Sequence, residues 1–236
     1  MIRRIGLLAV LTAGGLALAA PGPAAGATVI GRANTSTTGG VCLGGFTRLQ
    51  TATALYTVPL PGVLTSWSFA AAASPPQLRL KVGRPAGGTN FTIVGESPVE
   101  TMTANTLRTF QIRIPVQAGD VLGSYQATDG HCSSGSAGFS YVYVNVDQPL
   151  GTNETFSGPV TNTEIPLAAT LEPDADRDGF GDETQDQCPT NASTQGPCPT
   201  GERAAALKKC KKRAKKKHWS KKKLRKCKKK AKKLPV

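Results

Sequence analysis

The residues with the clearest chemistry are aspartates at alternate positions in one short segment. The segment contains Asp174, Asp176, Asp178, Gly179 and Asp182. Carboxylates at the first, third and fifth positions of a tightly wound loop converge on one point, and the glycine that follows them permits the sharp turn. Carboxylates packed this closely repel one another unless a cation lies among them. The spacing therefore predicts a cation site, and its hard oxygen donors favour calcium.

The spacing also indicates where further ligands would lie. In an EF-hand loop, the seventh position donates a backbone carbonyl and the ninth binds directly or through water. These positions hold Phe180 and Asp182 here. An EF-hand also requires glutamate at the twelfth position, where this chain has Gln185, and no room remains for an exiting helix before Cys188. A true EF-hand is therefore not expected.

The segment instead resembles a thrombospondin type 3 repeat, whose motif runs D-x-D-x-D-G-x-x-D and ends in Cys-Pro. The resemblance covers residues 174–189 and departs from the family at Gln185, where the family has Asp and where Asp186 comes one residue late. It implies a disulfide-held calcium segment with little helix or sheet. The implied calcium ligands are Asp174, Asp176, Asp178, Phe180, Asp182, Gln185 and Asp186. A single repeat predicts weak affinity, about 10⁻⁴–10⁻³ M; the alternative is an acidic, solvated linker.

The six cysteines are an even number, as expected of a chain that folds in an oxidising space. Sequence alone permits many pairings, but the positions fall into three couples. The expected disulfides are Cys42–Cys132, Cys188–Cys198 and Cys210–Cys227. The last two would close short local loops. A zinc site made from Cys210, His218 and Cys227 is the alternative for the last couple, although it lacks the closely spaced ligand pairs of zinc sites.

The N-terminal residues predict export. Arg3 and Arg4 precede an apolar run over residues 5–20, and the Ala-Gly-Ala sequence at 25–27 matches an A-x-A cleavage pattern before Thr28. Residues 1–27 are therefore expected to be a signal peptide. The mature protein is expected to be secreted or extracellular, with the cell wall as a site of association. No transmembrane helix is expected after cleavage, because no second apolar run is long enough. The alternative is an uncleaved N-terminal anchor.

Charge divides the rest of the chain into three parts. Residues 28–171 carry seven basic and seven acidic side chains, whereas residues 172–200 carry one arginine and seven acids. Residues 201–236 carry nineteen lysines and arginines and one glutamate. The net charge of +14 thus hides an acidic segment beside a strongly cationic tail. The expected domains are a β-sandwich (28–171), a thrombospondin type 3-like calcium-binding segment (172–200) and a Lys-rich helical tail (201–236).

The neutral part has the pattern of antiparallel strands. Short runs rich in β-branched and aromatic residues, several of them alternating apolar with polar, are separated by Pro and Gly turns. The expected strands are residues 56–60, 64–69, 78–82, 91–94, 110–114, 121–125 and 141–146. We therefore expect a mainly β fold, an antiparallel β-sandwich of jelly-roll or immunoglobulin-like type. A calcium-binding loop and a short basic helical hairpin are expected to follow it.

The β-domain has no convincing catalytic constellation. Ser124, His131 and Asp120 can be combined into a triad on paper, but their spacing is not specific, because a triad is defined by its spatial geometry. A loop histidine beside Cys132 is the simpler interpretation.

A set of aromatic residues could stack on a carbohydrate, although such residues are more often part of a core. This set is Trp67, Tyr56, Tyr125, Tyr141 and Tyr143.

The tail contains an internal repeat that predicts a helical hairpin. A Leu–Cys–Ala trio at positions i, i+3 and i+7 occurs twice, seventeen residues apart, and each trio defines one narrow helical face. The trios are Leu207, Cys210 and Ala214, and Leu224, Cys227 and Ala231. Ser220 is the expected N-cap of the second helix. An antiparallel hairpin would place the two cysteines opposite each other.

The charge of the tail demands a polyanion or a cloud of counterions. We expect anionic cell-wall or matrix polymers to bind residues 201–236. Nucleic acid is disfavoured as a partner, since export argues against it and Trp219 is the only aromatic residue available for base stacking. The alternative is a tail that only keeps the protein in solution.

These features favour a secreted, calcium-binding surface or matrix protein with a role in cell adhesion and without enzymatic activity. Its β-domain would present a face for a carbohydrate or protein ligand. The layout resembles that of exported proteins of high-GC actinobacteria. The alternative function is a secreted carbohydrate-active or hydrolytic enzyme, with the β-domain as its catalytic or glycan-binding module. That alternative rests on His131, the aromatic residues and scattered carboxylates.

Overall fold

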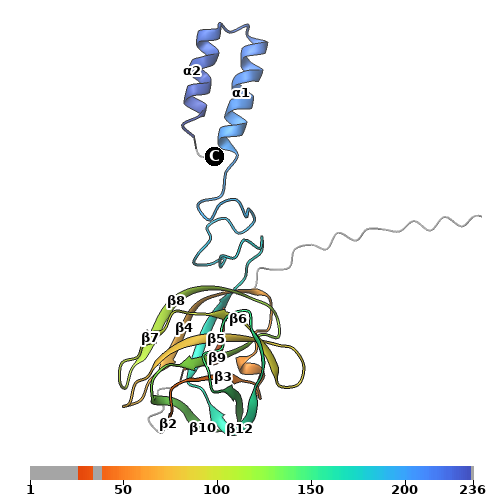
Figure 1. Cartoon of the computed structure of the whole chain (residues 1–236). Coiled ribbons are helices and arrows are strands. Elements are labelled where there is room, and N and C mark those ends of the chain that lie inside the picture. The colour runs from red at the N-terminus through yellow and green to blue at the C-terminus, as the bar shows by residue number, and fades with distance from the viewer. Residues whose placement is uncertain (1–25, 34–38, 235–236) are drawn as a thin grey trace, which may run out of the picture.

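The computed structural model describes residues 26–33 and 39–234. Residues 1–25 of the expected signal peptide lie outside the described residues. The described chain forms a β-rich body, then an irregular segment, then a pair of helices (Figure 1). The expectation of a mainly β fold followed by a helical hairpin is therefore confirmed.

Two antiparallel sheets form the β-rich body. The order of the smaller sheet is β1 (Thr28–Arg32), β13 (Leu167–Glu172), β4 (Gly62–Ala70) and β8 (Leu107–Val116). The order of the larger sheet is β11 (Asn153–Thr155), β6 (Asn90–Glu96), β5 (Gln77–Pro85), β9 (Val121–Gln126), β3 (Phe46–Gln50), β10 (Gly130–Val144) and β12 (Ser157–Glu164). Two short strands lie off this path, since β2 (Gly39–Cys42) pairs with β10 and β7 (Glu100–Thr101) pairs with β5.

The strand order is that of a jelly roll. In the smaller sheet the first strand, β1, pairs with the last strand, β13, and β4 and β8 follow. In the larger sheet β3, β9, β5 and β6 are neighbours, so the chain passes repeatedly from one sheet to the other. Interleaving of this kind closes two Greek keys into a sandwich. The strands β10 and β12 extend the larger sheet beyond β3. Of the two sandwich types expected, the jelly roll is the one observed.

The main core lies between the two sheets. Trp67 and Phe69 from β4, Leu80 from β5 and Leu122 from β9 are fully buried in it. Successive residues of a strand point to opposite faces, and a second buried cluster occupies the other face of the larger sheet. Its members are Leu49, Phe91, Ile93, Val121, Val142 and Phe156. The larger sheet is therefore apolar on both faces, which explains why several of its strands lack a clean alternation in the sequence.

Two local expectations are wrong. Residues 56–60 are not a strand, because Ala54–Tyr56 form a short 3-10 helix and Thr57 makes an isolated bridge to Val121. The Tyr56 hydroxyl donates a hydrogen bond of 2.6 Å to the Ile165 carbonyl, so a buried side-chain contact holds this segment. The stretch around His131 is not a turn, because pairing with β2 and β12 makes it the first part of β10.

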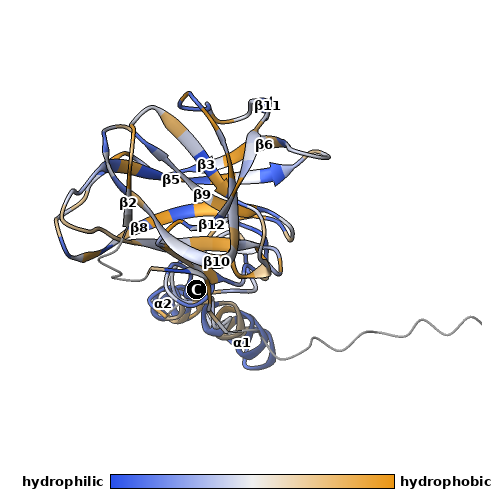
Figure 2. Ribbon diagram, turned by 90° about the horizontal axis from the view of Figure 1, so that it is seen from below, coloured by the Kyte–Doolittle hydropathy of each residue, from blue (hydrophilic) through white to orange (hydrophobic). Residues whose placement is uncertain are grey.

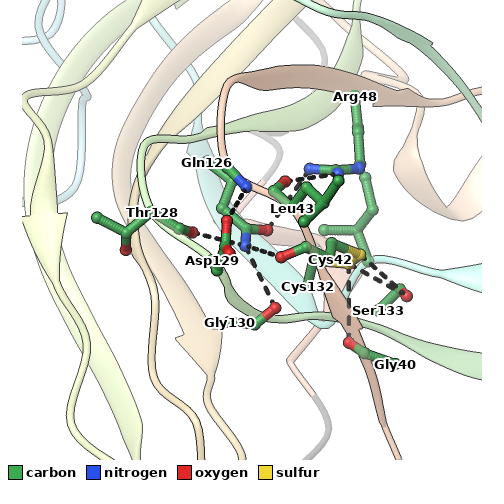
Figure 3. Close-up of a disulfide and its surroundings, with 12 residues drawn as sticks. Gly40, Cys42, Leu43, Arg48, Gln126, Thr128, Asp129, Gly130, Cys132 and Ser133 are labelled. Carbon is green, nitrogen blue, oxygen red and sulfur yellow. Dashed lines mark hydrogen bonds between the residues drawn. A yellow bond between two sulfur atoms is a disulfide. The ribbon is translucent and has the colours of Figure 1, made fainter.

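All three expected disulfides are present. They are Cys42–Cys132, Cys188–Cys198 and Cys210–Cys227. The first joins β2 to β10, with its Cα atoms 5.7 Å apart (Figure 3). Beside it, the buried Gln126 donates through Nε2 to the carbonyl oxygens of Cys42 at 3.2 Å and Thr128 at 2.8 Å. The disulfide and this amide together hold the edge strand β2 against the sandwich.

The tail consists of α1 (Glu202–Lys216) and α2 (Lys221–Ala231), joined by Cys210–Cys227. The Ser220 side chain accepts a hydrogen bond from the Lys223 amide, so the predicted N-cap is confirmed. Cys210 and Ala231 are buried at the helix contact, whereas most residues of both helices are hydrophilic (Figure 2). The predicted hairpin is confirmed. The zinc alternative is wrong, because the disulfide consumes both thiols.

Candidate metal centre

Three aspartates converge in the loop after β13. One carboxylate oxygen from each of Asp174, Asp176 and Asp178 lies within 4.8 Å of the others. All three side chains are partly buried. The alternating spacing therefore brings the carboxylates together as expected, and the cluster can hold a metal ion.

The backbone of the loop is wound around Asp174 and Asp178. The two Asp174 oxygens accept hydrogen bonds of 3.0 Å from the amides of Asp178 and Gly179, and Asp178 Oδ1 accepts one of 2.9 Å from the Phe180 amide. The turn requires positive φ angles at Arg177 (62°) and Gly179 (84°). Glycine adopts this conformation without steric cost. The D-x-D-x-D-G pattern thus encodes the tight turn as well as the carboxylates.

Asp176 and Asp186 supply buried oxygen atoms without hydrogen-bond partners. Both carboxylate oxygens of Asp176 and Oδ2 of Asp186 are buried and unpaired among the described residues. Asp186 is only 4% exposed, and its Oδ1 accepts a hydrogen bond of 2.7 Å from the Cys188 amide. Buried carboxylates normally bind a cation or are fully hydrogen-bonded. These unpaired oxygen atoms fit a bound cation.

The electrostatics of the loop agree with this geometry. Partial desolvation, and then the charge of Asp178, raise the pKa of Asp176 above its ordinary value, against the opposing effect of the nearby backbone amides of Asp178 and Asn191. Desolvation likewise raises the pKa of Asp182, and the charges of Asp174, Asp176 and Asp186 raise it further. In the absence of a cation, these carboxylates therefore disfavour one another's ionisation. A cation bound among these carboxylates would instead favour their ionised form.

Gln185 and Phe180 contribute to the packing of the loop. The Gln185 side chain donates through Nε2 to the Ile112 carbonyl at 2.8 Å and accepts through Oε1 from the Gly181 amide at 3.3 Å. The Gln185 side chain is thus engaged with β8 and the loop backbone. The Phe180 ring lies 4.0 Å from the guanidinium carbon of Arg113.

Glu172 attaches the loop to the sandwich, and the sequence analysis missed this role. Glu172 ends β13 and is 1% exposed. Its Oε2 accepts from the amides of Glu183 (3.0 Å) and Thr184 (2.9 Å), and its Oε1 accepts from the hydroxyls of Thr184 (2.7 Å) and Thr65 (2.9 Å). Desolvation opposes ionisation of Glu172, but these four hydrogen bonds outweigh it and lower its pKa. The sequence feature that could have indicated this role is an acidic residue at the end of a strand, two positions before Asp174.

The other side of the loop is tied to the segment that leads into the tail. Gln195 Nε2 donates a hydrogen bond of 2.7 Å to Asp178 Oδ2, and the Gln195 carbonyl accepts one of 2.9 Å from the Gln187 amide. The disulfide Cys188–Cys198 closes the same segment. The aspartate cluster therefore lies between an attachment to the sandwich and a cross-linked connection to the helices.

The catalytic triad drawn from the sequence does not assemble. The Asp120 carboxylate is paired with the Arg84 guanidinium at 2.8 and 2.9 Å. His131 is 1% exposed, and both of its ring nitrogens lack hydrogen-bond partners among the described residues. The centroids of the His131 and Phe69 rings lie 6.3 Å apart. Ser124, His131 and Asp120 are therefore not joined by hydrogen bonds.

Three of the aromatic residues proposed for a carbohydrate face belong to the core. Trp67 and Tyr56 are fully buried and Tyr141 is 8% exposed. Tyr125 and Tyr143 are partly buried, and Tyr125 packs against the cationic side chains of Arg79 and Lys81. Burial removes the first three residues from any stacking surface.

Comparison with known proteins does not extend these observations. No protein-family model matches the chain, and no significant match occurs among curated proteins or solved structures. Among the described residues, no helix has the length and apolarity required to span a bilayer. The three disulfides are compatible with an extracellular environment.

Proposed function

We propose that the protein is a secreted, calcium-binding surface or matrix protein without enzymatic activity. In this proposal, the loop that carries Asp174, Asp176 and Asp178 (the aspartate loop) binds calcium and stiffens the junction between the jelly roll and the cationic hairpin. The hairpin docks on anionic polymers of the cell envelope. The observation that carries the proposal is the buried, unpaired set of oxygen atoms on Asp176 and Asp186, facing the charges of the neighbouring aspartates.

The donor set favours calcium over softer metals. The clustered side chains offer carboxylate oxygens, and the cysteines next to them are consumed in the disulfide Cys188–Cys198. Calcium accepts six to eight oxygen ligands in a flexible shell, whereas zinc and copper favour imidazole or thiolate ligands. Asp174, Asp176 and Asp178 would hold the ion, with Asp182 and Asp186 close enough to share its charge. The resemblance to a thrombospondin type 3 repeat supports the same metal.

The position of the loop supports a role at a junction. Glu172 holds the loop to β13 and β4, while Gln195 joins Asp178 to the segment that continues into α1. An ion bound to Asp178 would therefore couple both connections. Calcium would act as a clip that restricts how the tail leaves the sandwich.

The cationic hairpin supports docking on polyanions. Residues 201–236 carry nineteen lysines and arginines, and all lysines of the two helices except the partly buried Lys228 are exposed. The disulfide Cys210–Cys227 holds the two helices together in spite of their mutual repulsion. Binding to an anionic polymer would release counterions and would weaken steeply with salt.

Calorimetric titration of the mature protein with calcium tests the proposal. We expect saturable binding to the native chain and its loss in the double variant Asp176→Asn with Asp178→Asn. Glu154→Gln is the matched control, because Glu154 is an exposed acid on β11, outside the loop. Calcium should also protect residues 172–200 from protease. Equal heats in the native chain and the double variant, or equal cleavage with calcium and with chelator, would overturn the metal role.

Docking by the tail requires a separate test. We expect the mature protein to bind purified cell-wall polymer at low salt and to be released as salt rises. A chain truncated after residue 200 should no longer bind, although it should retain calcium binding. Undiminished polymer binding by the truncated chain would contradict the proposed role of residues 201–236.

A further inference from the structure

A cleft of about 740 Å³ lies between the end of the jelly roll and the aspartate loop. Pro61, Arg84 and Pro115 line it on the side of the sandwich, and Asp174, Arg177 and Asp178 line it on the side of the loop. Two of the three clustered aspartates therefore border both the candidate metal centre and the cleft. The volume falls within the range of about 300–1,000 Å³ that is typical of small-ligand sites.

The sandwich side of the cleft carries a fixed guanidinium. Arg84 donates through Nε and Nη2 to the two oxygens of Asp120, which is 1% exposed. Asp120 also accepts a hydrogen bond of 2.8 Å from the Gln117 amide, so the pair is anchored. This pair uses one edge of the guanidinium, and 37% of the Arg84 side chain remains exposed. Arg84 is thus an oriented hydrogen-bond donor whose charge is already balanced.

The rest of the lining combines apolar surface with donors and acceptors. Pro61 and Pro115 are exposed and present C–H surfaces. Arg177, which is exposed at the tip of the aspartate turn, adds a second guanidinium. Such a lining suits a ligand that has apolar C–H faces and a rim of hydroxyl groups.

The charge balance disfavours an anionic ligand. One divalent ion together with Arg177 balances the three carboxylates of the cluster, and Arg84 is paired with Asp120, so no excess positive charge remains to hold an anion. Vicinal hydroxyls meet both requirements of the site, since their oxygens can coordinate calcium while their protons donate to carboxylates. The buried, unpaired Asp186 Oδ2 independently indicates that a cation belongs in the loop that lines one side of the cleft.

We propose that this cleft is a metal-dependent site for a neutral saccharide, with vicinal hydroxyls bound by the ion in the cluster and by Asp174 and Asp178. Arg84 and Arg177 donate to further hydroxyls, and Pro61 and Pro115 pack against the C–H face of the sugar. The inference rests on the proposed calcium binding and names the ligand class of the β-domain. It differs from tail docking, which requires a polyanion.

Titration of the mature chain with mannotetraose, cellotetraose and maltotetraose, with calcium and with chelator, tests this inference. We expect binding of at least one tetrasaccharide in calcium and no binding in chelator. Arg177→Gly should weaken binding about tenfold, as expected for loss of a charged hydrogen bond. Glycine accepts the φ of 62° at this position, so the turn is preserved. Arg108→Gln, on β8 and outside the cleft lining, is the matched control and should bind normally.

The outcomes separate this inference from the proposed function. Calcium binding without any saccharide binding overturns the cleft inference and leaves the proposed function standing. Absence of calcium binding overturns both. Saccharide binding that persists in chelator, or that is unchanged in Arg177→Gly, places the ligand elsewhere and overturns the inference. A calcium titration of Arg177→Gly shows whether the metal centre is intact in that variant.

Discussion

The carboxylate of Glu172 binds Thr184 twice: Oε2 accepts from the Thr184 amide at 2.9 Å, and Oε1 accepts from its hydroxyl at 2.7 Å. Glu172 is the last residue of β13, and Thr184 lies twelve residues later, beyond the aspartate cluster. The two ends of the aspartate loop are therefore fixed to one buried carboxylate. The loop is preorganised by the jelly roll rather than by its own sequence alone.

Replacement of this anchor should loosen the loop. In Glu172→Gln the carbonyl oxygen can still accept from the two backbone amides, but the amide nitrogen cannot accept from the Thr184 and Thr65 hydroxyls, and the charge that strengthens all four hydrogen bonds is lost. We expect a loss of about 2 kcal/mol in the free energy of unfolding, as for hydrogen bonds to a charged group, together with weaker calcium binding. Urea denaturation and calcium titration measure the two effects. Glu154→Gln, on exposed β11, should change neither.

Gln195 provides a subtler test of the junction. Gln195→Ala removes the 2.7 Å hydrogen bond to Asp178 Oδ2 without altering a carboxylate. Because groups that orient a metal ligand influence affinity by roughly 10- to 100-fold, we expect calcium to bind at least several-fold more weakly. The matched control is Gln187→Ala, since Gln187 contributes its backbone amide to this segment. Identical affinities for the two variants would contradict a positioning role for Gln195.

His131 should make the sandwich sensitive to acid. Burial lowers the pKa of His131 below its ordinary value of 6.5, so the folded state binds a proton less readily than the unfolded chain. Stability is therefore complete above about pH 6.5 and declines as the pH falls from the unfolded pKa towards the lowered folded pKa. His131→Phe should flatten this decline. It should lower the free energy of unfolding only slightly at neutral pH, because both ring nitrogens of His131 are unpaired and the ring lies beside Phe69.

Thermal unfolding measured from about pH 5 to 8 checks the His131 prediction. The exposed His218→Asn variant serves as control and should keep the native pH profile. An unchanged acid response in His131→Phe would show that another group is responsible.

The tail disulfide should decide whether the hairpin forms. Cys210→Ser with Cys227→Ser removes a cross-link over 17 residues, which corresponds to about 3 kcal/mol of loop entropy. Without the disulfide, nothing covalent opposes the repulsion between the lysines of the two helices. We therefore expect the helical circular dichroism signal that arises from residues 201–236 to be mostly lost at low salt. High salt or an added polyanion should restore part of it. Loss of the Cys188–Cys198 pair should leave tail helicity unchanged.

Local chemistry was readable from the sequence wherever residues near in the chain act together. The Asp174, Asp176 and Asp178 spacing predicted their convergence, because a tight turn involves only neighbouring residues. The Leu–Cys–Ala repeat predicted the stapled hairpin for the same reason, since a helix repeats over a few residues. The strands with strong apolar patterns, such as β4 and β5, were also found.

Features that depend on distant pairing were not readable. Strand β12 (Ser157–Glu164) is polar and largely exposed, and only its pairing with β10 makes it a strand. Residues 56–60 read as a strand, but the burial of Tyr56 against Ile165 holds them in another conformation. In both cases tertiary contacts override the local propensity.

The sequence by itself therefore determined the acidic loop, the disulfide couples, the charge division and the general β character of the domain. Tertiary structure decided the jelly-roll order, the attachment of the loop through Glu172, and the absence of hydrogen bonds from His131 to Asp120 or Ser124. It also decided that Asp174 and Asp178 border a cleft that Arg84 lines from the side of the sandwich. The physical reason is that hydrogen bonds and packing between segments far apart in the chain depend on the closure of the sandwich, and no local pattern encodes it.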